Sequence, residues 1–247
     1  MHHICVYTAS TAQAAEVDTA ALADSVLLIQ NGHFVPPQDM PLIFGGTASA
    51  NMSRGRISTP SLLTLTTPFI RPVSAAASWG MPPRINDLFM TPLTLKKLEE
   101  ITLLTFHGGA GAEQVWGILG LEVRRTPPPG GQVYTLRGIS TTAAVANTWT
   151  QIAMTWQNNL PVGTYAVVGG THQSANGIAF RLISPPDIWR PGGISITALG
   201  NETDEMFRNG YMGEWIRFQN YQFPNIEVVA GGADAAHEVY LDLVKVG

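Results

Sequence analysis

The sequence predicts an all-β fold, a β-sandwich or jelly roll, with two such domains in tandem. Short apolar segments rich in β-branched and aromatic residues recur along the chain, and several alternate with a period of two, as strands do. Gly- and Pro-rich turns separate them at near-regular spacing, which is typical of sandwiches and jelly rolls. With 247 residues, 45% of them hydrophobic, the chain can form one large β-domain or two small ones.

The central prediction is a hairpin between residues 163 and 191. Tyr165 to Val168 is a short apolar run, and Ile178 to Ile183 alternates in part. The intervening Gly169 to Gly177 is rich in turn-forming residues. We therefore expect two buried strands joined by this connector.

The first residues are harder to interpret. Met1 to Gln13 is polar and mixed, so we expect an N-terminal arm. Ala14 to Gln30 has the composition of a helix with imperfect spacing, although Val26 to Ile29 could instead open a strand. The pair Asn31-Gly32 predicts a turn.

Further along the first half, Ser61 to Ile70 is expected to be a strand that Pro68 interrupts. Thr91-Pro92 resembles a helix start, while the leucines that follow favour strands, so Leu93 to Glu100 stays open. Ile101 to Phe106 and Val115 to Val123 flank a glycine-rich turn and predict a second hairpin.

Thr126 to Gly131 is the best domain boundary, because three prolines are followed by two glycines. It divides the chain into 1–125, an arm with the first β-sandwich or jelly roll, a linker over 126–131, and 132–247, the second jelly roll. One complete barrel with an elaborated N-terminal half remains an alternative, since the length is short for two.

Strands of the second half are predicted at Val133 to Ile139, Thr148 to Trp156, Ile194 to Leu199, Trp215 to Phe218, Ile226 to Val229 and Val239 to Val246. The last of these strands, Val239 to Val246, is expected to close the second sheet.

Composition excludes several classes of protein. Charged residues make up 13% of the chain, against roughly 25% in ordinary soluble domains. So few charges indicate that other copies of the chain cover part of the surface. Lysine occurs only at Lys96, Lys97 and Lys245, which suits interfaces, although a codon bias toward Arg explains it equally well. The net charge of −4 argues against a nucleic-acid binder, and no signal peptide or membrane-spanning run is expected.

The sequence predicts no enzyme. His172 lies near Ser174 in the predicted connector, but we expect a loop histidine with one backbone hydrogen bond, and we interpret Asp234 with His237 in the same way. No catalytic residue, cofactor site or metal site is expected. His2, His3 and Cys5 could together hold a metal, but no second cluster completes a site, and Cys5 is poorly placed for a nucleophile in a terminal arm. The acidic run Glu202, Asp204 and Glu205 lacks the calcium-loop spacing and is expected to be a solvated turn.

Aromatic residues of the second half carry the functional hypothesis. Trp189, Tyr211, Trp215 and Tyr221 lie in or near predicted loops, where they could stack on sugar rings or anchor an interface. Interleaved arginines favour an interface, and Pro191 should hold its preceding residues outward. The expected interface residues are Trp189, Arg190, Tyr211, Trp215, Arg54 and Arg56.

Several stretches resemble the jelly-roll coat proteins of tailless icosahedral viruses and phages: Leu160 to Gly169, Ser174-Ala175, Ile178 to Leu182, Trp189 to Gly192, Phe207 to Gly210, Gly213 to Trp215 and Thr67 to Pro72. The resemblance implies a major capsid protein with two upright jelly rolls and no catalytic residues. It also implies trimeric or pseudo-hexameric capsomers, assembly in the host cytoplasm, and a location in the virion. Other virion proteins, and an internal membrane or genome contacted through the N-terminal arm, would be partners. A carbohydrate-binding or adhesion module is the alternative.

Overall fold

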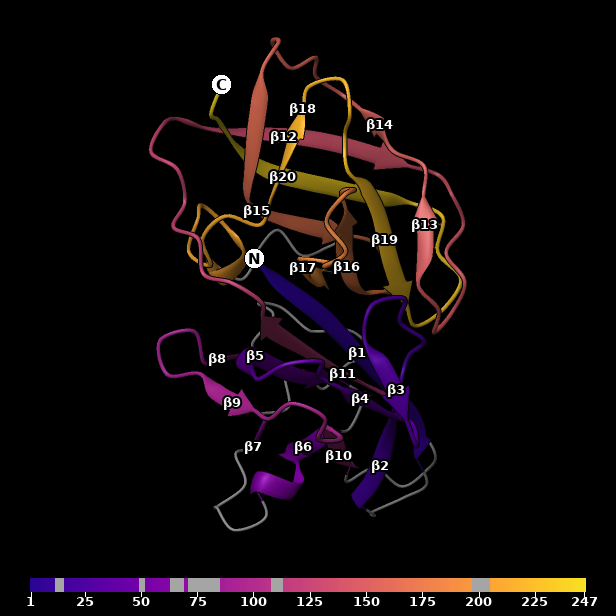
Figure 1. Ribbon diagram of the computed structural model, residues 1–247. Coiled ribbons are helices and arrows are strands. Elements are labelled where there is room, and N and C mark those ends of the chain that lie inside the picture. Colours follow the sequence, from indigo (N-terminus) through magenta and orange to yellow (C-terminus); the bar gives the residue numbers. More distant parts are fainter. Residues whose placement is uncertain (12–15, 49–51, 63–68, 71–84, 108–112, 197–204) are drawn as a thin grey trace. The chain divides into compact units, whose positions relative to one another are not determined.

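The computed structural model describes residues 1–11, 16–48, 52–62, 69–70, 85–107, 113–196 and 205–247. Its contacts divide the chain into two compact units: an N-terminal unit, Cys5–Glu122, and a C-terminal unit, Val123–Gly247 together with Met1–Ile4. Strands dominate both units, and the helical turns in the described residues are the 3-10 helices η1 (Pro60–Leu62) and η2 (Glu205–Phe207) (Figure 1). No helix in these ranges is both long enough and apolar enough to span a membrane.

The C-terminal unit has the strand order of a jelly roll. In chain order, its eight principal strands form two four-stranded halves, one ordered first-eighth-third-sixth and the other second-seventh-fourth-fifth. The halves are β12-β20-β15-β18 and β13-β19-β16-β17, and β17 joins them by pairing with β15 in parallel. The strands are β12 (Val133–Ser140), β13 (Thr150–Ile152), β14 (Thr155–Trp156), β15 (Thr164–Gln173), β16 (Gly177–Ile183), β17 (Gly192–Ile196), β18 (Ile216–Gln219), β19 (Asn225–Ala230) and β20 (His237–Lys245).

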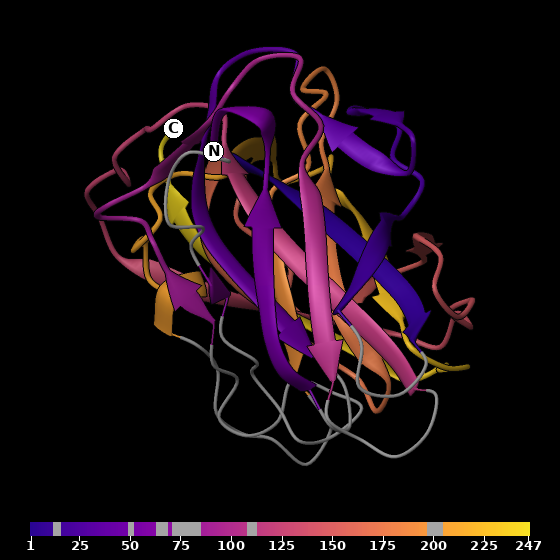
Figure 2. The same cartoon turned by 90° about the horizontal axis from the view of Figure 1, so that it is seen from below.

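The N-terminal unit repeats this order. One half is β1-β11-β5, followed by β8 or β9, which both pair with β5 and take the place of the sixth strand. The other half is β2-β10-β6-β7. Figure 2 shows its indigo and magenta strands running side by side. The strands are β1 (His2–Thr11), β2 (Glu16–Ala21), β3 (Leu28–Gln30), β4 (His33–Val35), β5 (Met40–Ala48), β6 (Met52–Ser58), β7 (Phe69–Ile70), β8 (Asn86–Asp87), β9 (Leu93–Leu95), β10 (Thr102–His107) and β11 (Glu113–Glu122).

The all-β prediction is therefore confirmed, and the chain is a double jelly roll. Because the same strand order occurs in both units, the chain contains two jelly rolls and not one barrel with an elaborated N-terminal half. Strands β3 and β4 form an additional hairpin through the predicted turn, where Asn31 (φ 50°) and Gly32 (φ 85°) take the left-handed conformations that a type I′ turn needs.

Both predicted hairpins are wrong. Strand β17 lies between β15 and β16, and the strands β2 and β1 separate β10 from β11. In a jelly roll, consecutive strands commonly belong to different halves, so sequence neighbours do not pair. The last strand, β20, also lies between β15 and β12 instead of closing the sheet.

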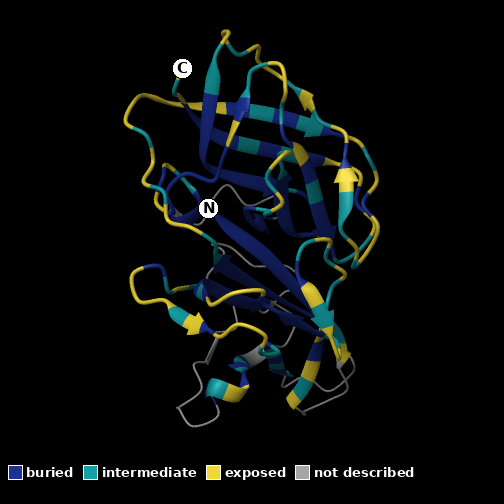
Figure 3. Ribbon diagram, in the orientation of Figure 1, coloured by how far each residue is buried: buried dark blue, intermediate teal, exposed yellow. Residues whose placement is uncertain are grey.

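The N-terminal arm is wrong as well. Residues His2–Thr11 form the strand β1, and Ile4, Cys5, Val6 and Tyr7 are fully buried (Figure 3). Tyr7 Oη donates a hydrogen bond to the Ile101 carbonyl at 2.8 Å. The segment that was predicted to reach a membrane or genome as an arm is therefore a strand of the core.

Other expectations in the first half have mixed outcomes. The segment considered as a helix contains the strand β2, and Leu93–Leu95 is the strand β9. Ser61 and Leu62 belong to η1, only Phe69 and Ile70 of the predicted strand form β7, and the part between them lies outside the described residues. The acidic residues Glu202 and Asp204 also lie outside them.

The segment before β12 offers a protease test of the predicted division. Arg124, Arg125 and most of residues 126–131 are exposed or half-buried. Limited trypsin digestion is expected to cut after Arg125 early, giving fragments of 125 residues and 247 − 125 = 122 residues. Because Met1–Ile4 belong to the C-terminal unit, the fragments should stay associated in native buffer and separate on a denaturing gel. Earlier cuts elsewhere in the unassembled chain would contradict the division.

Candidate interface site of the C-terminal unit

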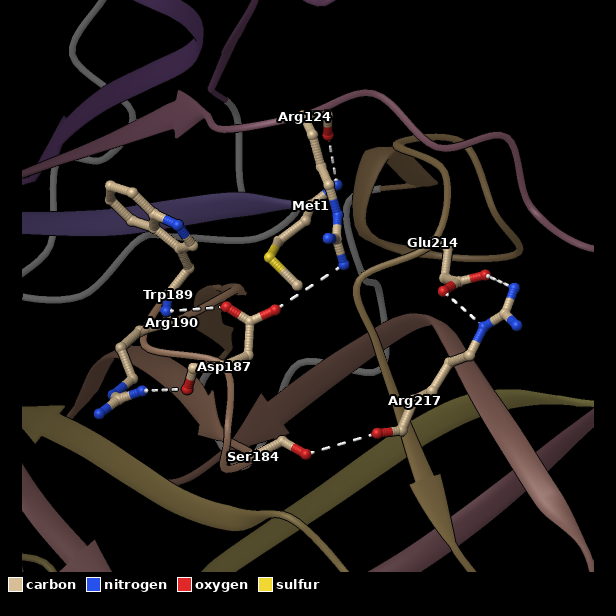
Figure 4. Close-up of polar contacts among 8 residues, drawn as sticks. All are labelled: Met1, Arg124, Ser184, Asp187, Trp189, Arg190, Glu214 and Arg217. Carbon is tan, nitrogen blue, oxygen red and sulfur yellow. Dashed lines mark hydrogen bonds and ion pairs between the residues drawn. The ribbon is translucent and has the colours of Figure 1, made fainter. Parts of the chain in front are cut away.

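Asp187 organises the loop that carries Trp189 and Arg190 (Figure 4). Its Oδ1 accepts a hydrogen bond from the Trp189 backbone N–H at 3.2 Å, and its carbonyl accepts one from Arg190 Nη1 at 3.2 Å. The Arg124 Nη2 lies 3.7 Å from Asp187 Oδ2. These contacts fix the loop locally, so its two large side chains are presented with little conformational freedom to lose.

The first strand fixes the same loop from another direction. The Arg190 backbone N–H donates to His3 Nδ1 at 3.2 Å, and the Ile4 N–H donates to the Arg190 carbonyl at 3.1 Å. The rings of His3 and Trp189 meet edge to face, with centroids 5.7 Å apart. Trp189 and Arg190 are consequently half-buried, less outward than the following proline suggested.

A groove of about 700 Å³ lies beside this loop. Its lining combines apolar residues with two ion pairs, Arg124–Asp187 and Arg217–Glu214. The second pair is bidentate, with Nε and Nη2 of Arg217 each 2.8 Å from a Glu214 oxygen, and this contact raises the pKa of Arg217. Since both of these arginines are paired with carboxylates, the groove suits a protein surface better than a free anion. Its lining includes Met1, Arg124, Pro186, Asp187, Ile188 and Arg217.

The two other predicted aromatic residues have different environments. Tyr211 is 43% exposed in the turn after η2. Trp215 is 1% exposed and packs in the core, with its ring edge-on to His2 at 5.1 Å and near Phe180 at 6.3 Å. Only Tyr211 of these two is available to a partner.

The predicted arginine pair lies on β6 of the N-terminal unit. Arg56 makes a bidentate contact with Glu16, at 2.8 and 2.7 Å, and its side chain is 35% exposed. The side chain of Arg54 lies outside the described residues. Arg56 thus uses its guanidinium within its own unit.

His172 occupies a position that the sequence did not predict. It lies within β15, fully buried, with Nδ1 2.6 Å from Ser195 Oγ and Nε2 3.1 Å from His237 Nδ1. The two imidazole rings stack with centroids 5.3 Å apart. Parallel pairing of β15 with β17 brings His172 opposite Ser195, and no local spacing in the sequence reveals that pairing.

This buried Ser195–His172–His237 row resembles part of a hydrolase site but is sealed from substrate. Burial, and then repulsion from His237, lower the pKa of His172 to about 3, so its imidazole is neutral. Ser195 and His237 are each 1% exposed. Because a nucleophile must reach its substrate, this row is part of the core. No cluster of three or more metal-ligating side chains occurs in the parts of the chain that the structure describes.

Comparisons with known proteins add little detail. No family model and no curated protein sequence matches this chain. Among solved structures, the major capsid protein P2 from bacteriophage PM2 is similar, with 11% identity and a TM-score of 0.27 over 100% of this chain and 98% of that chain. The STIV MCP is similar too, with 10% identity and a TM-score of 0.22 over 97% of each chain. At these scores neither superposition supports a functional inference.

Proposed function

We propose that this chain is a structural virion protein, a self-assembling major capsid protein that forms an icosahedral shell. The observation that carries the proposal is the pair of jelly rolls with one strand order in a single chain. Jelly rolls serve in viral capsids, lectins and cupins, so one alone would not select a function. Two in tandem give each subunit two similar building blocks, and a trimer then has six around its axis.

The use of the charged residues supports assembly. Several of the few charged side chains are buried in the C-terminal unit: Arg181 (2% exposed), Glu214 (6%) and Asp242 (0%). These side chains therefore contribute no charge to the outer surface. Large obligate interfaces bury more than about 2,000 Å² and are depleted in charge at their centre.

The remaining assignments follow from a shell role. Partners would be further copies of the chain, as trimeric or pseudo-hexameric capsomers, together with other virion proteins. The subunit would be located in the virion after assembly in the host cytoplasm. It would perform no catalysis and hold no cofactor.

A sugar-binding platform of Trp189, Tyr211 and Trp215 is not favoured. Trp215 is 1% exposed, and Trp189 is half-buried against β1. These three rings therefore do not form an open platform on which a sugar could stack.

Assembly is tested by size. Wild-type protein is expected to sediment as trimers or larger particles and to show shells in electron micrographs. Trp189→Ala with Arg190→Ala should leave a folded subunit, judged by circular dichroism, that fails to form large particles. Truncating such anchors costs roughly 2 kcal/mol per interface, and the loss recurs at every symmetry copy.

Val145→Ala is the control for this experiment, because Val145 is 60% exposed and belongs to no contact considered above. It should assemble as wild type does. Wild-type protein that stays monomeric at high concentration across salt and pH would contradict the shell function. Normal particles from the double variant would contradict only the choice of anchors.

A further inference from the structure

Two uncharged loops lie together at one end of the C-terminal unit. Residues 156–164 connect β14 to β15, and residues 218–225 run from the end of β18 to the start of β19 (Figure 1). We call them the amide loop pair. Neither loop contains an Asp, Glu, Lys or Arg, and no such residue occurs anywhere from 138 to 180. The amide side chains of the pair are Gln157, Asn158, Asn159, Gln219, Asn220, Gln222 and Asn225.

Hydrogen bonds clamp the two loops to each other. The Asn220 N–H donates to the Gly163 carbonyl at 3.1 Å, and the Gly163 N–H donates to Asn220 Oδ1 at 3.2 Å. Gln219 Nε2 donates to Thr164 Oγ1 at 2.9 Å. These bonds hold the ends of the two loops together without a ligand.

Four aromatic rings in or next to these loops pack against one another in a row. Trp156 stacks on Phe223 with centroids 5.4 Å apart, Phe223 contacts Phe218 at 5.6 Å, and Phe218 stacks on Tyr165 at 6.0 Å. Tyr221 is not part of this row and is 79% exposed. Its ring is thus an apolar face open to solvent, and Val162 in the other loop is 83% exposed.

A hollow of about 150 Å³ lies next to Gln222, the residue that follows Tyr221. Thr164, Ser184, Gln219 and Gln222 contribute uncharged polar groups to its lining, and the charged Arg217 also lines it. Glu214 balances the charge of Arg217 through Nε and Nη2, while the Nη1 donors lie outside that contact (Figure 4). The hollow is smaller than the roughly 300–1,000 Å³ of pockets for drug-sized ligands.

We propose that the amide loop pair binds a neutral oligosaccharide. A sugar ring has an apolar face of C–H groups, which Tyr221 can cover, and a rim of hydroxyls that both donate and accept hydrogen bonds. Amide side chains offer both donors and acceptors, as such a rim requires. Because hydrogen bonds already join the ends of the two loops, binding costs less conformational entropy than it would for separate loops.

Other ligands fit less well. A phosphate or carboxylate would meet no charged side chain within the loop sequences. In the hollow, Arg217 is paired with Glu214, and Lys245, whose side chain lies against Gly163, is not part of the lining. A second copy of the chain would need a larger apolar area than Val162 and Tyr221 supply. This proposal does not depend on the shell function, because single subunits present the same loops.

The test is a binding assay of the full chain against four neutral probes, maltohexaose, cellohexaose, chitohexaose and mannohexaose, by saturation-transfer NMR and calorimetry. At least one should bind, with an affinity that does not change with salt. Tyr221→Ala should weaken binding roughly tenfold, equivalent to about 1.4 kcal/mol, while Tyr221→Phe retains it. Gln222→Ala should weaken it several-fold.

Met90→Ala is the matched control, because Met90 is 78% exposed and lies in the other unit. It should bind as wild type does. Failure of all four probes to bind, or binding that Tyr221→Ala does not change, would overturn the proposal. So would affinity that falls steeply with salt, which indicates an anionic ligand, or a Tyr221→Ala effect confined to particle size, which indicates a subunit contact.

Discussion

Lowering the pH from 7 to 4.5 is expected to reduce the unfolding free energy of the C-terminal unit by about 5 kcal/mol through two histidines. His2 and His172 are both fully buried, and burial is the main cause that lowers the pKa of each to about 3. In the unfolded chain each has a pKa near 6.5. Between these values the unfolded state binds two protons that the folded state does not.

The sign follows from that difference. The stabilisation is complete above pH 6.5 and is lost as the pH falls toward about 3, at about 1.4 kcal/mol per proton and pH unit. Carboxylates bind protons mainly below about pH 4.5, so the histidines dominate the upper part of the range. Figure 3 shows the surroundings responsible, since β15 and the start of β1 are buried.

Urea unfolding followed by tryptophan fluorescence measures the effect, because four of the six tryptophans lie in this unit. The midpoint should fall sharply between pH 7 and pH 4.5. The variant His172→Gln should be less stable than the wild type at pH 7, because Ser195 and His237 lose a partner. Its unfolding free energy should nevertheless depend on pH about half as steeply as that of the wild type, because only His2 remains. Equal midpoints at the two pH values would contradict the neutral, buried state of both rings.

Strand positions were predictable because each depends on local residues. Strand-like composition identified β12 closely, partial alternation identified β16, and in β20 the residues Val239, Leu241 and Leu243, predicted to share one face, are buried. Pairing was not predictable, because the jelly-roll order joins strands far apart in sequence, such as β12 with β20. Two hairpins were predicted from neighbouring strands, which is the wrong rule for this topology.

The N-terminus shows a second limit of local pattern. His2 and His3 are polar by composition, and their polarity suggested an exposed arm. In the structure His2 Nε2 lies 2.7 Å from the Gly192 carbonyl, a partner 190 residues away. Long-range hydrogen bonds of this kind allow polar residues in a buried strand, and the sequence alone carries no sign of them.

The candidate site was predictable only in part. Trp189, Arg190 and Tyr211 lie at least partly at the surface, as their turn-rich surroundings indicated. Trp215 was misplaced because it immediately precedes β18, whose Ile216 and Phe218 are also buried. The amide loop pair has a sequence signal, the long charge-free stretch, but the clamp between its two loops depends on Gly163 meeting Asn220.

Asp242→Ala is expected to destabilise the C-terminal unit by about 3–5 kcal/mol, because it leaves a largely buried cation without its partner. Asp242 is fully buried in β20, and its Oδ2 and Oδ1 lie 2.6 and 2.8 Å from Nε and Nη2 of Arg208. It also accepts hydrogen bonds from the Asn209 N–H at 3.0 Å and from Thr135 Oγ1 at 3.2 Å. The contact raises the pKa of Arg208 and fastens the segment after η2 to the sheet.

The control is an exposed ion pair of the other unit. Lys96 and Asp39 are 3.0 Å apart with both side chains 52% exposed, so Lys96→Ala should leave the stability nearly unchanged. The double variant Arg208→Met with Asp242→Leu should recover much of the loss, because two apolar side chains leave no charge unpaired. Urea unfolding measures all three. A double variant as unstable as Asp242→Ala would contradict this expectation, because the loss would then not come from the unpaired Arg208 cation.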